Sequence, residues 1–167
     1  RRQQTIKKTV SITGIGVHSG EPVGLSFSPA GEGVGVVFRR NDLPGKPTIS
    51  ARPGNVEDTS RSTTLAEGGA RVKTVEHALG ALKAYGVDNV YVDLDAEEPP
   101  VGDGSAKIFV DMIEQSGLQQ QSSPVKKAVI QQPVYWSSGN THLVALPHEG
   151  FRVSCTLSYP HSQVLKA

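Results

Sequence analysis

Thr74-Val75-Glu76-His77-Ala78-Leu79 opens a segment in which apolar residues return with the period of an α-helix. Side chains three and four residues apart share one side of a helix, so this spacing predicts an amphipathic helix packed on a core. We expect Thr74 to act as its N-cap and Gly86 to end it, because these residue types favour the two helix termini. The apolar positions are Val75, Ala78, Leu79, Leu82 and Tyr85.

Glu76 and His77 fall beside this apolar stripe, and the pair suits a metal hydrolase. A neutral imidazole can bind zinc, and a neighbouring carboxylate can take the proton of the attacking water. The alternative is that the two residues are ordinary solvated helix surface, which is the commoner fate of a Glu-His pair. The dipeptide alone does not decide between the two.

Working outward from this helix, alternating apolar residues predict strands over residues 6–12, 23–27, 34–38 and 90–94. A second helix is expected to begin with Ser105 as its N-cap and to end before Gly117. Its buried residues should be Ile108, Phe109, Met112 and Ile113. Strands and helices in this order predict an α+β fold.

Residues 119–124, Gln-Gln-Gln-Ser-Ser-Pro, are polar and lack periodicity, so we predict a linker there. The first domain would then span residues 1–118 and the second residues 125–167. In the second, residues 151–159 alternate like a strand, and Cys155 is expected to be buried with its apolar neighbours.

The sequence after this linker is similar to the beginning of the chain. Residues 125–129, Val-Lys-Lys-Ala-Val, correspond to residues 6–10, Ile-Lys-Lys-Thr-Val, at an offset of 119 residues from Lys7 to Lys126. The same offset relates Ser19-Gly20 to Ser138-Gly139. We therefore predict a duplicated fold whose second copy is incomplete in this chain. Chance similarity is the competing explanation, because Lys-Lys between apolar residues is common.

Composition excludes several classes of protein. The 167 residues carry 17 basic and 16 acidic side chains, and their scatter offers no electrostatic footprint for nucleic acid. Cys155 is the single cysteine, so no disulfide forms within the chain and a cytoplasmic location is expected. No apolar run approaches the ~18 residues of a spanning helix, so no transmembrane segment is predicted.

Several short motifs together resemble a known family, the zinc-dependent UDP-3-O-acyl-N-acetylglucosamine deacetylases of lipid A biosynthesis. They follow the family's order at compatible spacing, from about Gln4 to the end of the chain. The motifs are Gln4-Thr5-Ile6, Gly14-Ile15-Gly16-Val17-His18-Ser19-Gly20, Phe38-Arg39-Arg40, Thr63-Thr64-Leu65, Thr74-Val75-Glu76-His77, Gly86-Val87-Asp88-Asn89 and Asp103-Gly104-Ser105-Ala106.

The resemblance implies a two-domain enzyme in which each domain is a small sheet layered with two helices, with a catalytic zinc ion between the domains. Glu76 would be the general base and His77 one zinc ligand. The family's other ligands lie in a His-Lys-x-x-Asp motif of the second domain, which this sequence lacks, so the remaining C-terminal half is an expected partner, as a continuation or a companion chain. The implied substrate is a UDP-linked acylated amino sugar, whose N-acetyl group is hydrolysed.

The resemblance also implies substrate-binding residues. His18 would approach the active site, although a turn histidine bonded to local backbone is the alternative. Ser60, Arg61, Ser62 and Thr63 match a segment that lines the entrance and the acyl passage. Many relatives have apolar side chains there, so a solvated loop is an equally good interpretation.

A second hypothesis comes from a different class of protein. A non-catalytic binding or assembly module could keep the duplicated fold without the second catalytic half. A His-Lys-x-x-Asp motif and a later histidine, in a continuation or a companion chain, would favour the enzyme.

Overall fold

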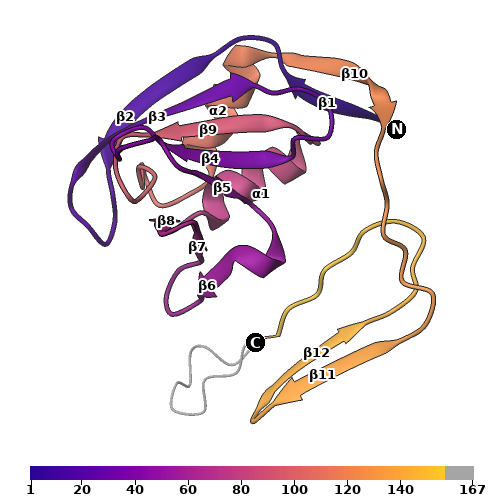
Figure 1. Cartoon of the computed structure of the whole chain (residues 1–167). Coiled ribbons are helices and arrows are strands. Elements are labelled where there is room, and N and C mark those ends of the chain that lie inside the picture. Colours follow the sequence, from indigo (N-terminus) through magenta and orange to yellow (C-terminus); the bar gives the residue numbers. More distant parts are fainter. Residues whose placement is uncertain (157–167) are drawn as a thin grey trace. The chain divides into compact units, whose positions relative to one another are not determined.

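The computed structural model describes residues 1–156, and the chain divides into two compact units, Arg1–Val125 and Lys126–Ala167 (Figure 1). The first unit is built on a five-stranded sheet with the order β2-β3-β9-β4-β5. Neighbouring strands are antiparallel except β4 and β9, which are parallel. The strands are β2 (Val10–Ile15), β3 (Pro22–Pro29), β4 (Val36–Arg40), β5 (Thr48–Ser50) and β9 (Val90–Leu94).

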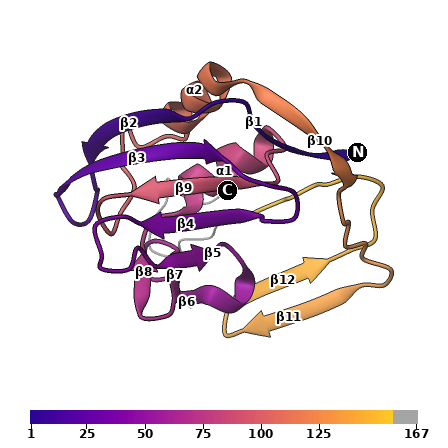
Figure 2. The same ribbon diagram turned by 45° about the horizontal axis from the view of Figure 1, so that its top comes forward.

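Helices α1 (Glu76–Ala84) and α2 (Lys107–Ser116) both cover one face of this sheet (Figures 1 and 2). Alternate residues of the central strands are buried, as period-two alternation requires of a strand with one covered face. The ring of Phe27 on β3 packs near that of Phe109 on α2, with centroids 6.2 Å apart. The predicted α+β fold with a sheet and two helices in two layers is therefore confirmed.

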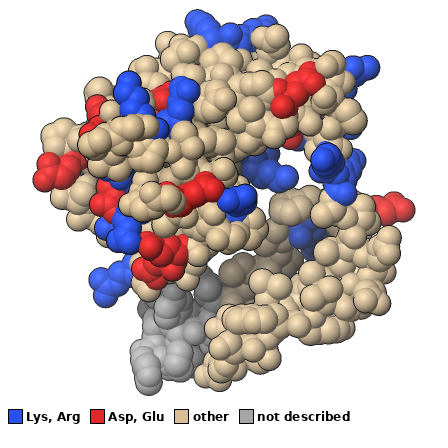
Figure 3. Space-filling view, in the orientation of Figure 1, with Lys and Arg blue, Asp and Glu red and all other residues tan. Residues whose placement is uncertain are grey.

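The other face of the sheet is polar. Arg39 of β4 donates two hydrogen bonds of 2.7 and 2.6 Å to Asp93 of β9, and its guanidinium lies 4.2 Å from the ring centre of Tyr91. Over the face of the first unit shown in Figure 3, basic and acidic side chains are interspersed.

Strands β1 (Arg2–Ile6) and β10 (Leu118–Pro124) pair as a two-stranded antiparallel ribbon. The prediction of a linker at residues 119–124 is therefore wrong, since these residues form most of β10. Their polar side chains suggested a loop, but ladder hydrogen bonds come from the backbone and do not require apolar residues. The strand predicted over residues 6–12 is likewise divided, because β1 ends at Ile6 and β2 begins at Val10.

A second, smaller sheet is formed by the residues between β5 and α1. It has the order β6-β7-β8 and follows a short 3₁₀ helix, η1 (Pro53–Asn55). The strands are β6 (Val56–Asp58), β7 (Thr64–Glu67) and β8 (Ala70–Val72). The loop between β6 and β7 contains residues 59–63, which the resemblance connects with substrate.

The start of α1 differs from the prediction. Val75 is the residue before its first turn, and no side chain caps it. Thr74 is not the N-cap: it has a left-handed backbone (φ 53°) and its hydroxyl bonds elsewhere. Helix α2 begins at Lys107, slightly after the expected start, and Ser105 accepts a 3.1 Å hydrogen bond from the Lys107 N–H.

In the second unit, β11 (Val134–Ser138) and β12 (Thr141–Ala145) form an antiparallel hairpin. Only residues 139–140 join these strands, whereas residues 16–21 join β2 to β3. The offset of 119 residues maps Pro22, the first residue of β3, onto Thr141, the first residue of β12, but it does not align β2 with β11. The duplicated fold stays a prediction.

Residues 151–156 belong to no strand, and Cys155 is exposed, which contradicts its predicted burial. An alternating sequence forms a strand only where a neighbouring strand pairs with it. The remaining positions of this predicted strand, 157–159, lie outside the described residues. Within residues 1–156, the helices are too short and too polar to cross a membrane.

Candidate functional site

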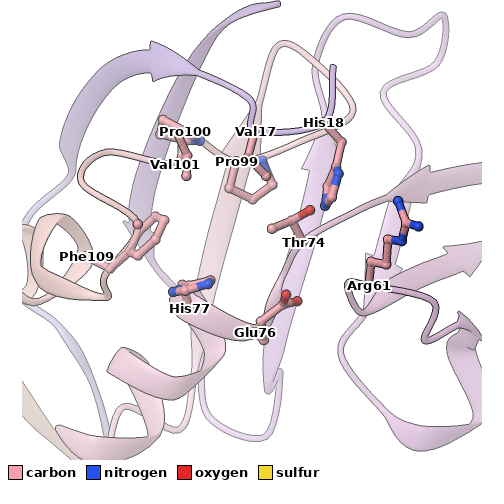
Figure 4. A pocket seen from close by; sticks show the side chains of 11 residues that line it. Val17, His18, Arg61, Thr74, Glu76, His77, Pro99, Pro100, Val101 and Phe109 are labelled. Carbon is pink, nitrogen blue, oxygen red and sulfur yellow. The ribbon is translucent and has the colours of Figure 1, made fainter. Parts of the chain in front are cut away.

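The first unit contains a pocket of about 300 Å³ beside the N-terminus of α1 (Figure 4). Its walls come from five segments: the β2–β3 loop, the β6–β7 loop, the start of α1, the connection between β9 and α2, and α2 itself. Glu76, His77, His18 and Arg61 supply its charged and titratable side chains. Four of the residues named from the sequence are thus brought together around one cavity.

Glu76 and His77 are the first two residues of α1, and both side chains line the pocket (Figure 4). The Glu76 carboxylate accepts a 3.0 Å hydrogen bond from the Thr63 N–H. The Thr63 carbonyl in turn accepts one of 3.3 Å from the Val75 N–H. These bonds connect the β6–β7 loop to the start of the helix and hold the exposed Glu76 carboxylate at the cavity.

His18 reaches the same cavity from the β2–β3 loop. The backbone N–H of His18 donates a hydrogen bond of 3.0 Å to the side chain of Glu98. His18 therefore lies at the pocket because a residue 80 positions later in the chain holds its backbone.

Residues 60–63 do not act as a group. Arg61 lines the pocket, with a left-handed backbone (φ 62°) and an exposed side chain. Thr63 contributes the N–H that binds Glu76. Ser60 bonds through its N–H to Asp58 at 3.0 Å, and Ser62 is half-buried; neither serine lines the cavity.

One wall of the cavity is apolar and was not foreseen from the sequence. It includes Pro99, Pro100 and Val101 from the β9–α2 connection, and Phe109 from α2. Pro100 packs so closely on β2 that a Cβ at Gly14 would lie 2.7 Å from its Cβ. The pocket thus presents titratable groups beside an apolar surface.

Glu98 was also missed by sequence reasoning. Its side chain is only 1% exposed, and it begins the segment that continues as Pro99-Pro100. An acidic residue followed by two prolines between a strand and a helix was the available signal, since prolines restrict the backbone of such a connection.

The residues fit a zinc site only in part. His77 can supply one imidazole ligand, as the resemblance implies. Residues 1–156 hold no cluster of three or more histidine, cysteine, aspartate or glutamate side chains able to bind a metal ion, whereas catalytic zinc usually has three protein ligands.

Comparison with known proteins identifies the family. A family model for UDP-3-O-acyl N-acetylglycosamine deacetylase (LpxC) matches residues 3–167. Proteins named UDP-3-O-acyl-N-acetylglucosamine deacetylase are similar over nearly all of the chain. The one from Chlamydia muridarum is 46% identical, over 99% of this chain and 57% of its own length. Those from Methylococcus capsulatus and Bdellovibrio bacteriovorus are 43% and 40% identical, over 96% and 98% of this chain and 53% and 54% of their own lengths.

The chain belongs to the UDP-3-O-acyl-N-acetylglucosamine deacetylase family, which confirms the resemblance carried by its motifs. It spans about half the length of the curated relatives that it matches.

Proposed function

We propose that the protein hydrolyses the N-acetyl group of UDP-3-O-acyl-N-acetylglucosamine in lipid A biosynthesis, with this chain supplying part of the active site. The observation that carries the proposal is the placement of Glu76 and His77 side by side on the first turn of α1, both facing one pocket. Family membership supplies the substrate class, through the names of the relatives.

Amide hydrolysis needs a nucleophilic water, stabilisation of the developing oxyanion and a proton for the departing amine. Glu76 would accept the proton of the attacking water, since its carboxylate is held at the cavity by the Thr63 N–H. His77 would be one ligand of a zinc ion, which when bound supplies Lewis-acid chemistry. The remaining ligands and the acid for the amine would come from the C-terminal half.

His18 and Arg61 would bind the substrate. Arg61 places a positive charge at the cavity, and a guanidinium is suited to the phosphate oxygens of a UDP group. The apolar wall offers a surface to the uncharged part of the same molecule. Ser60, Ser62 and Thr63 would act as the loop that carries Arg61. We place the reaction in the cytoplasm, consistent with a single cysteine in 167 residues.

A non-catalytic binding or assembly module is less well supported. Such a module would have no need for a glutamate and a histidine that share a pocket, nor for a backbone N–H that orients the glutamate.

Two substitutions in the full-length protein test the proposal. Glu76→Ala should keep the zinc and lower turnover by ~10²–10⁴-fold, because it removes only the general base. His77→Ala should lower both zinc content and turnover, because it removes a ligand. Zinc is measured by elemental analysis and turnover with the acylated UDP-sugar.

Asp111→Ala is the control, since it removes an exposed acidic group from α2 that pairs with Lys107 and does not line the cavity. This variant should behave as the wild type. Near-normal turnover of Glu76→Ala would remove Glu76 from the mechanism.

A further inference from the structure

Glu98 joins three of the segments that form the pocket. Its Oε2 accepts hydrogen bonds of 3.0 Å from the N–H groups of both His18 and Ser19 in the β2–β3 loop. Its Oε1 accepts a 2.6 Å bond from the hydroxyl of Thr74, two residues before Glu76. Glu98 itself leads into Pro99, in the apolar wall. One side chain therefore connects the loop of His18, the start of α1 and the β9–α2 connection.

The backbone has two unusual features next to the Glu98 carboxylate, at Gly16 and at Thr74. A Cβ at Gly16 would lie 2.5 Å from Glu98 Oε2, so only glycine lets the β2–β3 loop pass this close. Thr74 adopts φ 53°, a left-handed conformation that is strained for a residue other than glycine. Such a conformation persists only where other interactions hold the residue in place, and the hydrogen bond from the Thr74 hydroxyl to Glu98 is one of them.

Glu98 is held as an anion although it is buried. Burial by itself would raise the pKa of Glu98, but the hydrogen bonds from Thr74, Ser19 and His18 outweigh burial and lower the pKa below its ordinary value. No ion pair with Glu98 is found among residues 1–156, so neutral donors alone stabilise its charge. An apolar residue would be the simpler solution for a core position that served packing only.

We propose that Glu98 is a positioning residue of the active site, whose carboxylate holds His18 at the cavity and sets the backbone from which Glu76 and His77 project. This inference rests on the proposed deacetylase function, because positioning is meaningful only for a reaction in this pocket. Glu98 does not line the cavity and touches no reacting atom; it acts through the residues that it binds.

The test compares Glu98→Gln with Glu97→Gln in the full-length protein. Glutamine keeps the size of the side chain but removes its charge, so the N–H groups of His18 and Ser19 lose their anionic acceptor, and the single carbonyl oxygen of glutamine can accept either from them or from the Thr74 hydroxyl, but not at both places. Turnover should fall by ~10–100-fold, as is typical when a supporting residue of a site is lost. Glu97 is the matched control, because this half-buried neighbouring acid pairs with Lys73 at 3.3 Å and does not line the cavity.

Amide hydrogen exchange supplies the readout that a general loss of stability would not reproduce. In Glu98→Gln, the amides of His18 and Ser19 should exchange at least ~10-fold faster, while those of β3 and β9 keep wild-type rates. Glu98→Asp, which retains the charge on a shorter side chain, should recover part of both turnover and protection. Zinc content should remain that of the wild type.

Normal turnover with unchanged exchange at His18 would overturn the proposal. Faster exchange throughout β3 and β9 would overturn it as well, because Glu98 would then only stabilise the fold. If Glu98→Gln does not fold, Thr74→Val removes one of the three bonds, and a normal turnover for that variant would count against positioning. An inactive wild type would refute the deacetylase function, whereas the exchange result would still decide whether Glu98 orders the loop.

Discussion

Gly16 shows how a single residue decides whether this pocket can form. It is buried where the β2–β3 loop passes Glu98, and it accepts through its carbonyl the N–H of Gly20 at 3.0 Å. A Cβ there would meet both the Glu98 carboxylate and the hydroxyl of Ser19. The glycine is required by space, since its φ is not positive.

Gly16→Ala should therefore destabilise the chain by about 1–3 kcal/mol, the usual cost of forcing an extra methyl group into a packed site. Urea unfolding measures the change. Gly54→Ala is the control, because nothing lies within 4 Å of a Cβ at that position. Equal urea midpoints for Gly16→Ala and Gly54→Ala would show that the β2–β3 loop can shift to accommodate the methyl group.

At the scale of elements, α1 combines a functional N-terminus with an imperfect interior. Its first turn carries Glu76 and His77, while Gly80 lies exposed in the middle of the helix. Glycine weakens a helix interior because it loses more backbone entropy on folding than alanine does. The stability of α1 consequently depends on the buried face formed by Ala78, Ala81 and Leu82.

Gly80→Ala should stabilise the chain by about 0.5–1 kcal/mol, because a Cβ there meets no atom within 4 Å. Gly86→Ala is the matched opposite: Gly86 follows the helix with φ 68°, which alanine adopts only with strain. Thermal unfolding of both variants should give shifts of opposite sign, and a lower melting temperature for Gly80→Ala would contradict this account.

The β1–β10 ribbon is held to the rest of the first unit by Glu32, between β3 and β4. Its carboxylate accepts 2.6 Å bonds from the N–H and hydroxyl of Ser122, and a further bond from the Ser123 hydroxyl. The hydroxyls of Ser122 and Ser123 are the main reason that the pKa of Glu32 is lowered from 4.5 to about 2. Stabilisation from this depressed pKa is complete above about pH 4.5 and is lost as the pH falls toward 2.

Glu32→Gln should therefore unfold at a lower urea concentration than the wild type near neutral pH, and the gap should narrow as the pH falls from 4.5 to 2. Urea midpoints measured from pH 6 to pH 2 check this. Glu57→Gln, which removes an exposed carboxylate paired with Arg71 on the small sheet, controls for the loss of one negative charge. A gap that does not change with pH would show that Glu32 acts in another way.

At the scale of the molecule, the two units differ in how completely their apolar side chains are buried. The first buries a continuous apolar core from the sheet and both helices. In the second, the described residues leave large apolar side chains open to solvent: Val129, Ile130, Val134, Tyr135, Trp136, Leu143, Val144, Leu146, Phe151 and Val153. No charged side chain interrupts residues 131–147. Exposed apolar surface of this kind marks a site of association.

Residues 1–125, expressed alone, should fold with a single cooperative transition and give a monomer. Residues 1–167 should bind a hydrophobic dye more strongly or self-associate, because they add the exposed hairpin. Unfolding by circular dichroism and size-exclusion chromatography compare the two, and Trp136→Ser with Tyr135→Ser should reduce dye binding. A monomeric chain of 167 residues that binds no dye would refute this expectation.

Local patterns in the sequence were sufficient for much of the fold and for part of the site. The period of 3.6 predicted α1 and alternation predicted β3 and β9, because each pattern reports which side chains of one segment share a face. Glu76 and His77 were recognisable because they are adjacent on one helix, and their motif belongs to the family that the comparisons confirm.

What the tertiary structure alone decided depends on groups that are distant in sequence. Residues 119–124 form a strand only because β1 offers its backbone from the other end of the chain. Glu98 binds donors that are 80, 79 and 24 residues away, and no local period records such a bond. Thr74 likewise does not cap α1, because its hydroxyl bonds to Glu98, 24 residues later in the chain. A sequence pattern describes a face, whereas hydrogen bonds between segments exist only once folding has brought their partners together.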